Sequence, residues 1–160
     1  LLQARTQSAG KRVLREVTSR LQLLTSAQLD LLRLGTRADQ QCLLWLAACK
    51  RYQMLLDFGR EIIRHKFLQL DLIVSLPDFD QFLETQSIWH PELETLADST
   101  RAKLRQVTFR MLREAELLND QNIIQPIVLS SEIATAIQMD TMTLFSIFPI
   151  SDADIRTALS

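Results

Sequence analysis

The stretch Cys42–Ala48, CLLWLAA, decides the fold, because its side chains are apolar all the way around a helix. A helix that has no polar face is buried on every side, so we expect this segment to form the central helix. Thr36 followed by Asp39 resembles a capping box and predicts where that helix begins. Apolar residues at helical spacing from Tyr52 to Leu70 continue the pattern, and they predict a second long stripe in the core.

The residues before this centre predict two more helices. Ser8–Leu24 has the apolar spacing of an amphipathic helix, one face of which is expected to pack on the core. The residues of that face are Leu14, Val17, Leu21 and Leu24. A second helix is expected over Ser26–Leu34, because the Gly35 that follows is a common residue at the end of a helix.

The residues after the centre predict a series of shorter helices. Their expected starting signals are, in chain order, Leu76-Pro77-Asp78, Trp89-His90-Pro91, Asp98-Ser99-Thr100 and Ser130 or Ser131. Between the last two, Asn119–Leu129 is expected to form a short hairpin or a loop laid on the core, and the tail Thr141–Ser160 has no assignment. Both tryptophans, Trp45 and Trp89, are expected in the core.

The fold class that follows is all-α, a compact helical bundle. We expect residues 1–76 to form an N-terminal helical part that contains a first helix-turn-helix with an incomplete N-terminal end. Residues 77–160 are expected to form a winged-helix-like part, and the two parts are expected to pack as one globular unit.

The chain has few residues suited to catalysis or to cofactor binding. The three glycines, Gly10, Gly35 and Gly59, cannot form a phosphate-binding loop. The two histidines, His65 and His90, stand far from each other and from both cysteines, so metal-ligand spacing is missing. We therefore expect no enzyme activity, no cofactor, no metal and no small-molecule substrate.

Membrane insertion and secretion are not expected either. The longest charge-free runs, Gln121–Ser131 and Thr141–Ser151, have eleven residues each, whereas a membrane-spanning helix needs about 18–20. Cys42 and Cys49 lie seven residues apart in a Leu-rich stretch, which favours buried thiols over a disulfide framework. The prediction is a cytoplasmic protein whose N-terminus carries no secretory leader.

Basic charge is concentrated in two segments of a chain whose net charge is −1. The first 20 residues carry a net charge of +4 and residues 99–118 carry +3, so the remainder carries −8. The two segments also resemble each other, since LREVTSRL at 14–21 aligns with LRQVTFRM at 104–111 with five of eight positions identical. In the second copy, Arg105, Gln106, Arg110 and Arg113 are expected to face outward.

These features together predict a DNA-binding surface. Between Asp78 and Val128 the expected order is helix, short helix, turn, basic helix and a possible wing, which is the order of a winged helix-turn-helix. The candidate DNA-binding residues are Arg5, Lys11, Arg12, Arg15, Ser99, Thr100, Arg101, Lys103, Arg105, Gln106, Arg110 and Arg113. Gln7, Ser8, Gln106 and Thr108 are candidates for contacts with base edges.

Two long runs of the sequence carry a resemblance to a known family. They are LLWLAACKRYQMLLDFGREIIRHKFLQLD over Leu43–Asp71 and HPELETLADSTRAKLRQVTFRMLREAELL over His90–Leu118. Both resemble the BrxA family, a core component of bacterial bacteriophage-exclusion (BREX) defence systems, and the opening LLQARTQSAGKRVLREVTSRL is similar to the first block of that family. The resemblance extends from Leu1 to about Ser131.

The resemblance implies a compact all-helical protein with two helix-turn-helix elements that binds double-stranded DNA. The first element would use Thr6–Arg20 and the second Ser99–Arg113, and the other components of the defence system would be partners. Glu116 departs from the family pattern, which usually has Gly after the helix. Two alternatives remain open at this point: a protein-interaction scaffold within the defence complex, and an RNA-binding helical bundle of the NusB kind.

Overall fold

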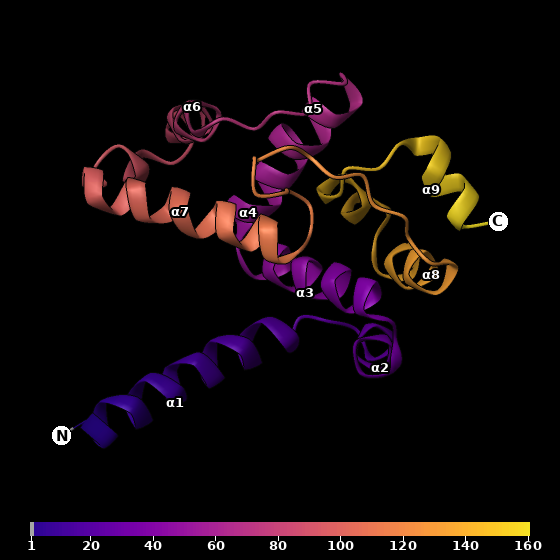
Figure 1. The fold of residues 1–160 in the computed structure, drawn as a ribbon, viewed down its shortest axis with the longest axis horizontal. Coiled ribbons are helices and arrows are strands. Elements are labelled where there is room, and N and C mark those ends of the chain that lie inside the picture. Colours follow the sequence, from indigo (N-terminus) through magenta and orange to yellow (C-terminus); the bar gives the residue numbers. More distant parts are fainter. Residues whose placement is uncertain (1) are drawn as a thin grey trace.

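The structure is a computed structural model that describes the backbone of residues 2–160 and the side chains of residues 7–160. Its helices confirm the all-α prediction (Figure 1). In chain order they are α1 (Leu2–Leu21), α2 (Ser26–Leu34), α3 (Arg37–Arg51), α4 (Gln53–Phe58), the π-helical turn η1 (Gly59–Arg64), α5 (His65–Leu68), α6 (Leu76–Ser87), the 3₁₀ turn η2 (Pro91–Leu93), α7 (Asp98–Glu114), α8 (Ser131–Asp140), the 3₁₀ turn η3 (Met142–Ile147) and α9 (Asp152–Ala158).

The central position of α3 is confirmed, with one exception. Its residues from Trp45 to Cys49 are buried, and the Trp45 indole N–H donates to the carbonyl oxygen of Ile147 at 3.1 Å. Leu44, however, is 50% exposed, so α3 has one open side. That side faces the region between α1 and α7, and it contributes to the groove described below.

An aromatic cluster joins the central helices to α6 and α7. Phe58, at the end of α4, contacts Phe79 and Phe82 of α6 with ring centroids 5.4 and 5.1 Å apart, and it contacts Phe109 of α7 at 6.4 Å. Next to it, Gly59 lies so close to η3 that an added Cβ would stand 3.1 Å from the carbonyl oxygen of Ile147. One hydrophobic core therefore includes residues from α3 to α9.

Local capping signals place most helix ends where the sequence predicts them. Thr36 and Asp39 form a capping box at the start of α3, and Ser75 and Asp78 form another at the start of α6. Ser130 caps α8 through a hydrogen bond from the backbone N–H of Ile133. The prediction was wrong for α7, because residues 98–100 lie inside its first turn and the preceding N-cap residue has no capping side chain.

The segment that follows α7 is a loop laid on the core, which was one of its two predicted forms. Isolated antiparallel bridges join Leu118 to Ile124 and Ile73 to Ile123, and Ile124 is buried. Within the described part of the chain these bridges do not extend into strands. The wing and the helix-turn-helix arrangement remain predictions, although the order of α6, η2 and α7 matches the expected one.

Two predictions of burial were wrong. Trp89 is 78% exposed at the end of α6, because the chain turns there into η2 on the surface. In α1, Leu24 beyond the helix end is buried and Leu21 is partly buried, but Leu14 is 67% exposed and Val17 42% exposed. The reason is visible in Figure 1, where α1 projects from the body and only its C-terminal end meets the other helices.

Candidate nucleic-acid interface

Helix α7 presents one exposed polar face. Ser99, Lys103, Gln106 and Arg110 are exposed, and their spacing of four, three and four residues places them on one side of the helix. The opposite side is buried and contains Phe109 and Leu112. A DNA-contacting helix needs one apolar face that packs on the protein core. Its opposite face needs cations and amides that can reach phosphates and base edges.

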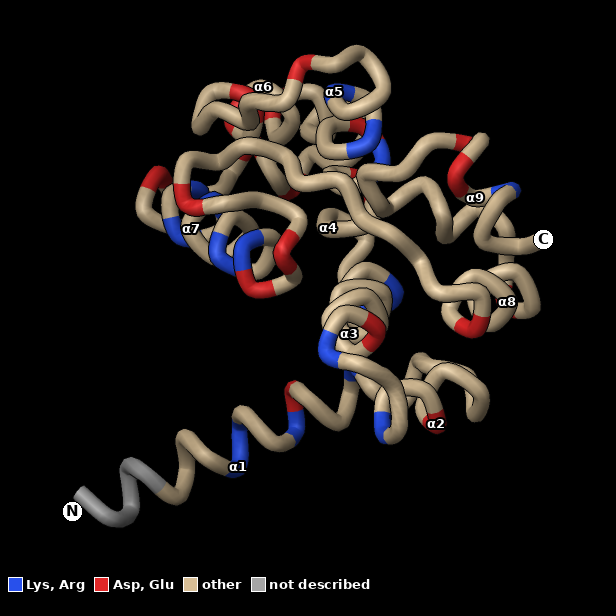
Figure 2. The backbone as a smooth tube through the Cα atoms, turned by 45° about the vertical axis from the view of Figure 1, so that its right-hand side comes forward, with Lys and Arg blue, Asp and Glu red and all other residues tan. Residues whose placement is uncertain are grey.

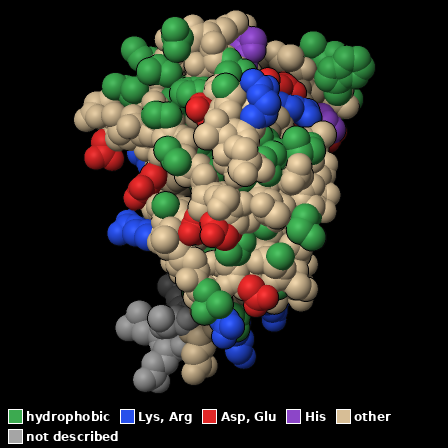
Figure 3. All heavy atoms as spheres, turned by 90° about the vertical axis from the view of Figure 1, so that its right-hand side faces the viewer, with side chains coloured by type: hydrophobic (Ala, Val, Ile, Leu, Met, Phe, Trp, Pro, Cys, Tyr) green, Lys and Arg blue, Asp and Glu red, His purple; other side chains and the backbone are tan. Residues whose placement is uncertain are grey.

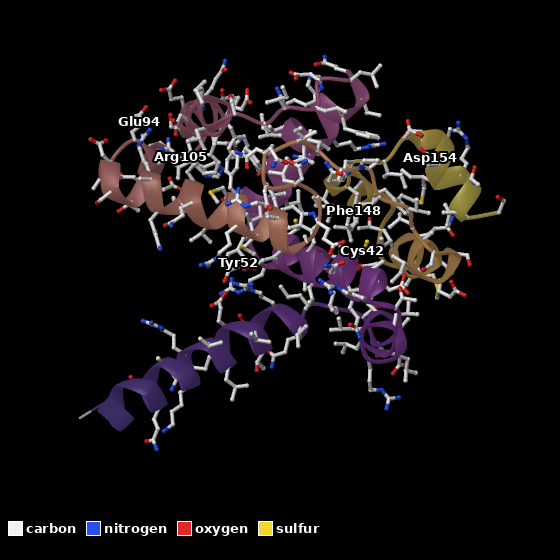
Figure 4. The ribbon with its side chains drawn as sticks, in the orientation of Figure 1. Cys42, Tyr52, Glu94, Arg105, Phe148 and Asp154 are labelled. Carbon is white, nitrogen blue, oxygen red and sulfur yellow. The ribbon has the colours of Figure 1, made fainter. Side chains whose placement is uncertain are left out.

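Arg105 does not belong to this exposed face. Its guanidinium Nη1 lies 2.8 and 2.6 Å from the two carboxylate oxygens of Asp80 on α6, and Figure 4 shows it on the side of α7 that is turned toward α6. Its side chain is 29% exposed. The expected outward orientation of Arg105 is therefore wrong, because this pair fixes α7 to α6 and neutralises the charge.

Two other arginines of α7 are held by internal contacts. Arg101 donates to the carbonyl oxygen of Leu93 in η2 at 3.0 Å, and Arg113 donates to the side-chain oxygen of Asn122 at 2.8 Å. Both side chains are intermediate in burial. Arg101 and Arg113 therefore hold α7 against η2 and against the loop that follows α7, and their guanidinium groups are less available to phosphates than exposed cations are.

Thr108 cannot contact a base edge. It is 1% exposed, and its hydroxyl has no hydrogen-bond partner among the described residues. At 100° per residue it lies on the buried side of α7 with Phe109 and Leu112. This prediction is corrected, whereas Gln106 remains exposed on the polar face, where Lys103 donates to its side-chain oxygen at 3.2 Å.

The cations of α1 form a second exposed face. Lys11, Arg12 and Arg15 are exposed and form no ion pair among the described residues. Gln7 and Ser8 are exposed on the same helix, whereas the side chains of Arg5 and Thr6 lie outside the described residues. Arg20 differs, because it pairs with Glu16 at 3.3 Å and lies over the ring of Tyr52.

The two basic helices lie on the same side of the molecule. Figures 1 and 2 place both α1 and α7 away from α8 and α9, with Lys and Arg positions along each. Their C-terminal parts border a common groove. On the α8 and α9 side, basic and acidic side chains are interspersed among hydrophobic ones, as Figure 3 shows. Basic charge is thus distributed unevenly over the structure as it is along the sequence.

Sequence reasoning missed the partners that remove cations from the candidate set. Asp80 lies 25 residues from Arg105 and Asn122 lies nine from Arg113, so no short motif joins either pair. Arg37 was missed as well: its side chain is 84% exposed at the start of α3, with Glu116 at 3.6 Å as its ion-pair partner. A count of charges along the sequence cannot separate free cations from paired ones.

The cysteines are unsuited to nucleophilic or metal chemistry. Burial raises the pKa of the Cys42 thiol to about 12, and the nearby Asp39 carboxylate contributes to this shift. Burial also raises the pKa of Cys49 well above its ordinary value. A thiol of high pKa stays protonated at neutral pH, and only the thiolate attacks or binds a metal. Among the residues whose side chains are placed, three or more His, Cys, Asp or Glu do not converge on one point.

None of the helices between residues 2 and 160 combines the length and apolar character needed to cross a bilayer.

Fold and site together define an all-helical protein with two exposed basic helix faces. The BrxA family model matches residues 1–141, so the chain belongs to the BrxA family. A curated relative, the BREX protein BrxA of Bacillus cereus, is 25% identical over 121 residues. That match covers 76% of this chain and 60% of the relative, so the chain spans less than two thirds of the relative's length.

The fold also has a solved counterpart. The crystal structure of an uncharacterized protein from Magnetospirillum magneticum has a TM-score of 0.74 and 21% sequence identity. The superposition covers 82% of this chain and 71% of that one. This likeness shows that the helical architecture is shared.

Proposed function

We propose that the protein is a non-enzymatic, double-stranded DNA-binding component of a bacterial phage-exclusion system in the cytoplasm. Membership of the BrxA family and similarity to a protein named as a BREX component support the defence role. One observation carries the DNA-binding part of the proposal. Helices α1 and α7, which carry the exposed cations Lys11, Arg12, Arg15, Lys103 and Arg110, lie on the same side of the molecule (Figure 2).

The mechanism is phosphate neutralisation by these two helices. Each Lys or Arg that contacts a phosphate releases condensed counterions, so affinity falls as the salt concentration rises. Ser99 and Gln106 supply a hydroxyl and an amide next to the α7 cations, where they can contact sugar-phosphate oxygens or base edges. Affinity then comes from the cations, and any sequence preference comes from the polar residues between them.

Salt-dependent binding to unrelated duplexes tests the proposal. Fluorescence anisotropy is measured with two labelled duplexes of different sequence at about 50 and about 200 mM salt. We expect both duplexes to bind, with a steep loss of affinity at the higher salt concentration. A marked preference for one duplex would add base readout, whereas failure of both duplexes to bind would refute the proposal.

A matched pair of variants locates the interface. Lys103→Ala combined with Arg110→Ala removes two cations from the exposed face of α7 and is expected to reduce the salt slope by about two. Arg156→Ala removes an exposed cation from α9, on the other side of the molecule, and is the control. If the salt slope fell equally per removed cation in the two variants, the exposed face of α7 would not be the DNA-binding surface.

A further inference from the structure

A pocket of about 420 Å³ lies between η1, η3 and α9. Pockets that bind small molecules have volumes of about 300–1,000 Å³. Figure 1 places α9 on the side of the body away from α1 and α7, and the described lining residues of the pocket all lie outside those two helices. The pocket is therefore distinct from the candidate nucleic-acid interface.

Two close contacts fix the walls of this pocket against each other. Gly59 begins η1 and packs on Ile147 at the end of η3, where an added Cβ would stand 3.1 Å from the carbonyl oxygen of Ile147. At the other end of η1, the Nε of Arg64 donates to the carbonyl oxygen of Ile150 at 3.2 Å. The turn η1 is π-helical, a rare form that occurs frequently at functional sites. The pocket is thus built into the packed body.

Two arginines supply positive charge to the pocket. The Nη2 of Arg64 lies 2.5 Å from a carboxylate oxygen of Asp152, and the Arg64 side chain is 16% exposed. Arg156 follows Asp152 by four residues on α9, so the two side chains share one face of that helix. Arg156 is exposed and forms no ion pair among the described residues. Guanidinium groups placed in this way can bind phosphate oxygens through paired hydrogen bonds.

Asp152 is the carboxylate with which a phosphate ligand competes. Its side chain is 75% exposed, and exposed ion pairs are weak. A phosphate carries more negative charge than a carboxylate and has three strong acceptor oxygens, so it can replace Asp152 on Arg64 and engage Arg156 as well. Arg60 also lines the pocket but already pairs with Asp57 and Glu61, so it contributes no free charge.

The turn η3 presents two rows of side chains to the pocket. Residues three apart eclipse in a 3₁₀ helix, so Met142 aligns with Phe145, and Thr143 aligns with Ser146. The first row, together with Ile155 of α9, forms an apolar wall. In the second row, the Ser146 hydroxyl donates to the carbonyl oxygen of Thr143 at 2.6 Å. The hydroxyl oxygen of Ser146 therefore remains an acceptor for a ligand hydroxyl.

From these observations we infer that the pocket binds a ribonucleoside 5′-monophosphate. Arg64 and Arg156 hold the phosphate, and Ser146 accepts a hydrogen bond from a ribose hydroxyl. The base lies against the apolar wall, where the thioether of Met142 contacts the flat ring. Cations, an acceptor and an apolar wall thus match the phosphate, the sugar and the base of one ligand.

Isothermal titration calorimetry of the full chain tests this assignment. The probes are the four ribonucleoside 5′-monophosphates, the corresponding nucleosides and inorganic phosphate. We expect at least one monophosphate to bind with a Kd below about 1 mM, and its nucleoside and inorganic phosphate to bind at least about tenfold more weakly. Failure of all four monophosphates to bind would overturn the inference. Inorganic phosphate that bound as tightly as a monophosphate would overturn it as well, because the pocket would then be a simple anion site.

Variants of the pocket separate binding from general loss of structure. Arg156→Gln removes an exposed cation and is expected to weaken nucleotide binding about tenfold. Asp152→Asn removes the competing carboxylate and is expected to tighten binding about threefold, a gain that loss of structure does not produce. Arg33→Gln removes an exposed cation from α2, outside the pocket, and is the control. Weaker binding by Asp152→Asn, or equal effects of Arg156→Gln and Arg33→Gln, would overturn the inference.

Duplex DNA is the other source of phosphate, and it distinguishes this site from the proposed DNA-binding surface. Arg156→Gln is expected to bind a labelled duplex as the wild type does, and an unlabelled duplex is expected not to displace the bound nucleotide. Displacement by the duplex would assign the pocket to nucleic acid and overturn the inference. Failure of the wild type to bind duplex would refute the proposed function and leave the nucleotide result intact.

Discussion

Helices α1 and α7 have nearly the same sequence pattern and opposite environments. Leu14 is 67% exposed in α1, whereas Leu104, at the equivalent place in α7, is partly buried against the core. Arg15 is exposed without an ion pair among the described residues, whereas Arg105 is paired with Asp80. An amphipathic pattern thus specifies a helix with two unlike sides, but the width of its apolar side decides whether the helix is packed into the body.

That width is encoded at positions where the two aligned segments differ. Phe109 and Leu112 of α7 are buried, and the equivalent positions hold polar residues, Ser19 in α1 and Gln22 directly after it. Phe109 also contacts Phe58 and Phe79, which belong to other helices. Helix α7 therefore has enough apolar surface to become part of the core, whereas α1 has only a narrow stripe.

The largest expected effect comes from the aromatic residue that distinguishes α7. Phe109→Ala removes a ring that is 2% exposed and is expected to lower the free energy of unfolding by about 3–5 kcal/mol. The equivalent change in α1, Ser19→Ala, is expected to alter it by less than about 0.5 kcal/mol. Urea denaturation followed by circular dichroism measures both. Similar losses for the two variants would mean that α1 is as firmly packed as α7.

The second prediction uses pH to separate the packed body from α1. Burial alone would raise the pKa of Asp140, but hydrogen bonds from Lys50 and Gln28 outweigh it and hold this pKa below its ordinary value. The stability supplied by such a carboxylate is present above the unfolded pKa of about 3.9 and is lost as the pH falls through the lower, folded value. Asp140→Asn is expected to lower stability at pH 7 by about 1–2 kcal/mol.

The difference between the Asp140→Asn variant and the wild type should begin to shrink as the pH falls below about 4, because the unfolded wild-type chain then takes up a proton at this carboxyl more readily than the folded chain does. Arg15→Ala in α1 is the control and should leave the pH dependence of unfolding unchanged. A difference that stays constant from pH 7 to pH 3 would contradict the proposed role of the charged form of Asp140.

The third prediction compares two arginines at equivalent positions, Arg15 of α1 and Arg105 of α7. Arg15→Ala is expected to weaken duplex binding several-fold and to lower the salt slope by about one, with little change in stability. Arg105→Ala is expected to leave the salt slope unchanged and to cost about 0.5–1 kcal/mol of stability, since its partner Asp80 is nearly half-exposed. Anisotropy and urea denaturation measure the two effects. The reverse result would mean that Arg105 leaves Asp80 when DNA binds.

Much of the fold could be predicted from the sequence because its signals are local. The Thr36 and Asp39 box, the Gly35 end of α2 and the Leu76-Pro77-Asp78 start of α6 each depend on residues within one helical turn. The apolar run at the centre of α3 predicts its central burial in the same way. Such signals need no knowledge of the rest of the chain.

The candidate site was harder to predict because its decisive contacts join distant parts of the sequence. Asp80 neutralises Arg105 across 25 residues, and Arg113 is held by the loop that follows α7. The buried position of Thr108 follows from the aromatic cluster around Phe109, which forms only when α4, α6 and α7 pack together. Periodicity predicted the polar arc of α7 but not which of its cations remain free.

An effect on stability as small as that of Arg105→Ala, but of opposite sign, is expected where α7 ends. Glu116 has a φ of 58°, in the left-handed region that costs a non-glycine residue about 1–2 kcal/mol. The backbone N–H of Leu117 donates to the carbonyl oxygen of Leu112, which is the pattern of a helix end that favours glycine. Helix α1 ends without a residue of positive φ. A glycine at this place would therefore relieve backbone strain.

Glu116→Gly is therefore expected to raise the free energy of unfolding by about 0.5–1 kcal/mol, because part of the relief is offset by the greater freedom of glycine in the unfolded chain. The ion pair of Glu116 with Arg37 has little weight in this comparison, since both side chains are more than 60% exposed. Glu116→Ala keeps the backbone strain and removes the same ion pair, so it should have nearly wild-type stability in urea. If the alanine and glycine variants were equally stable, backbone strain at the end of α7 could not be what distinguishes it from the end of α1.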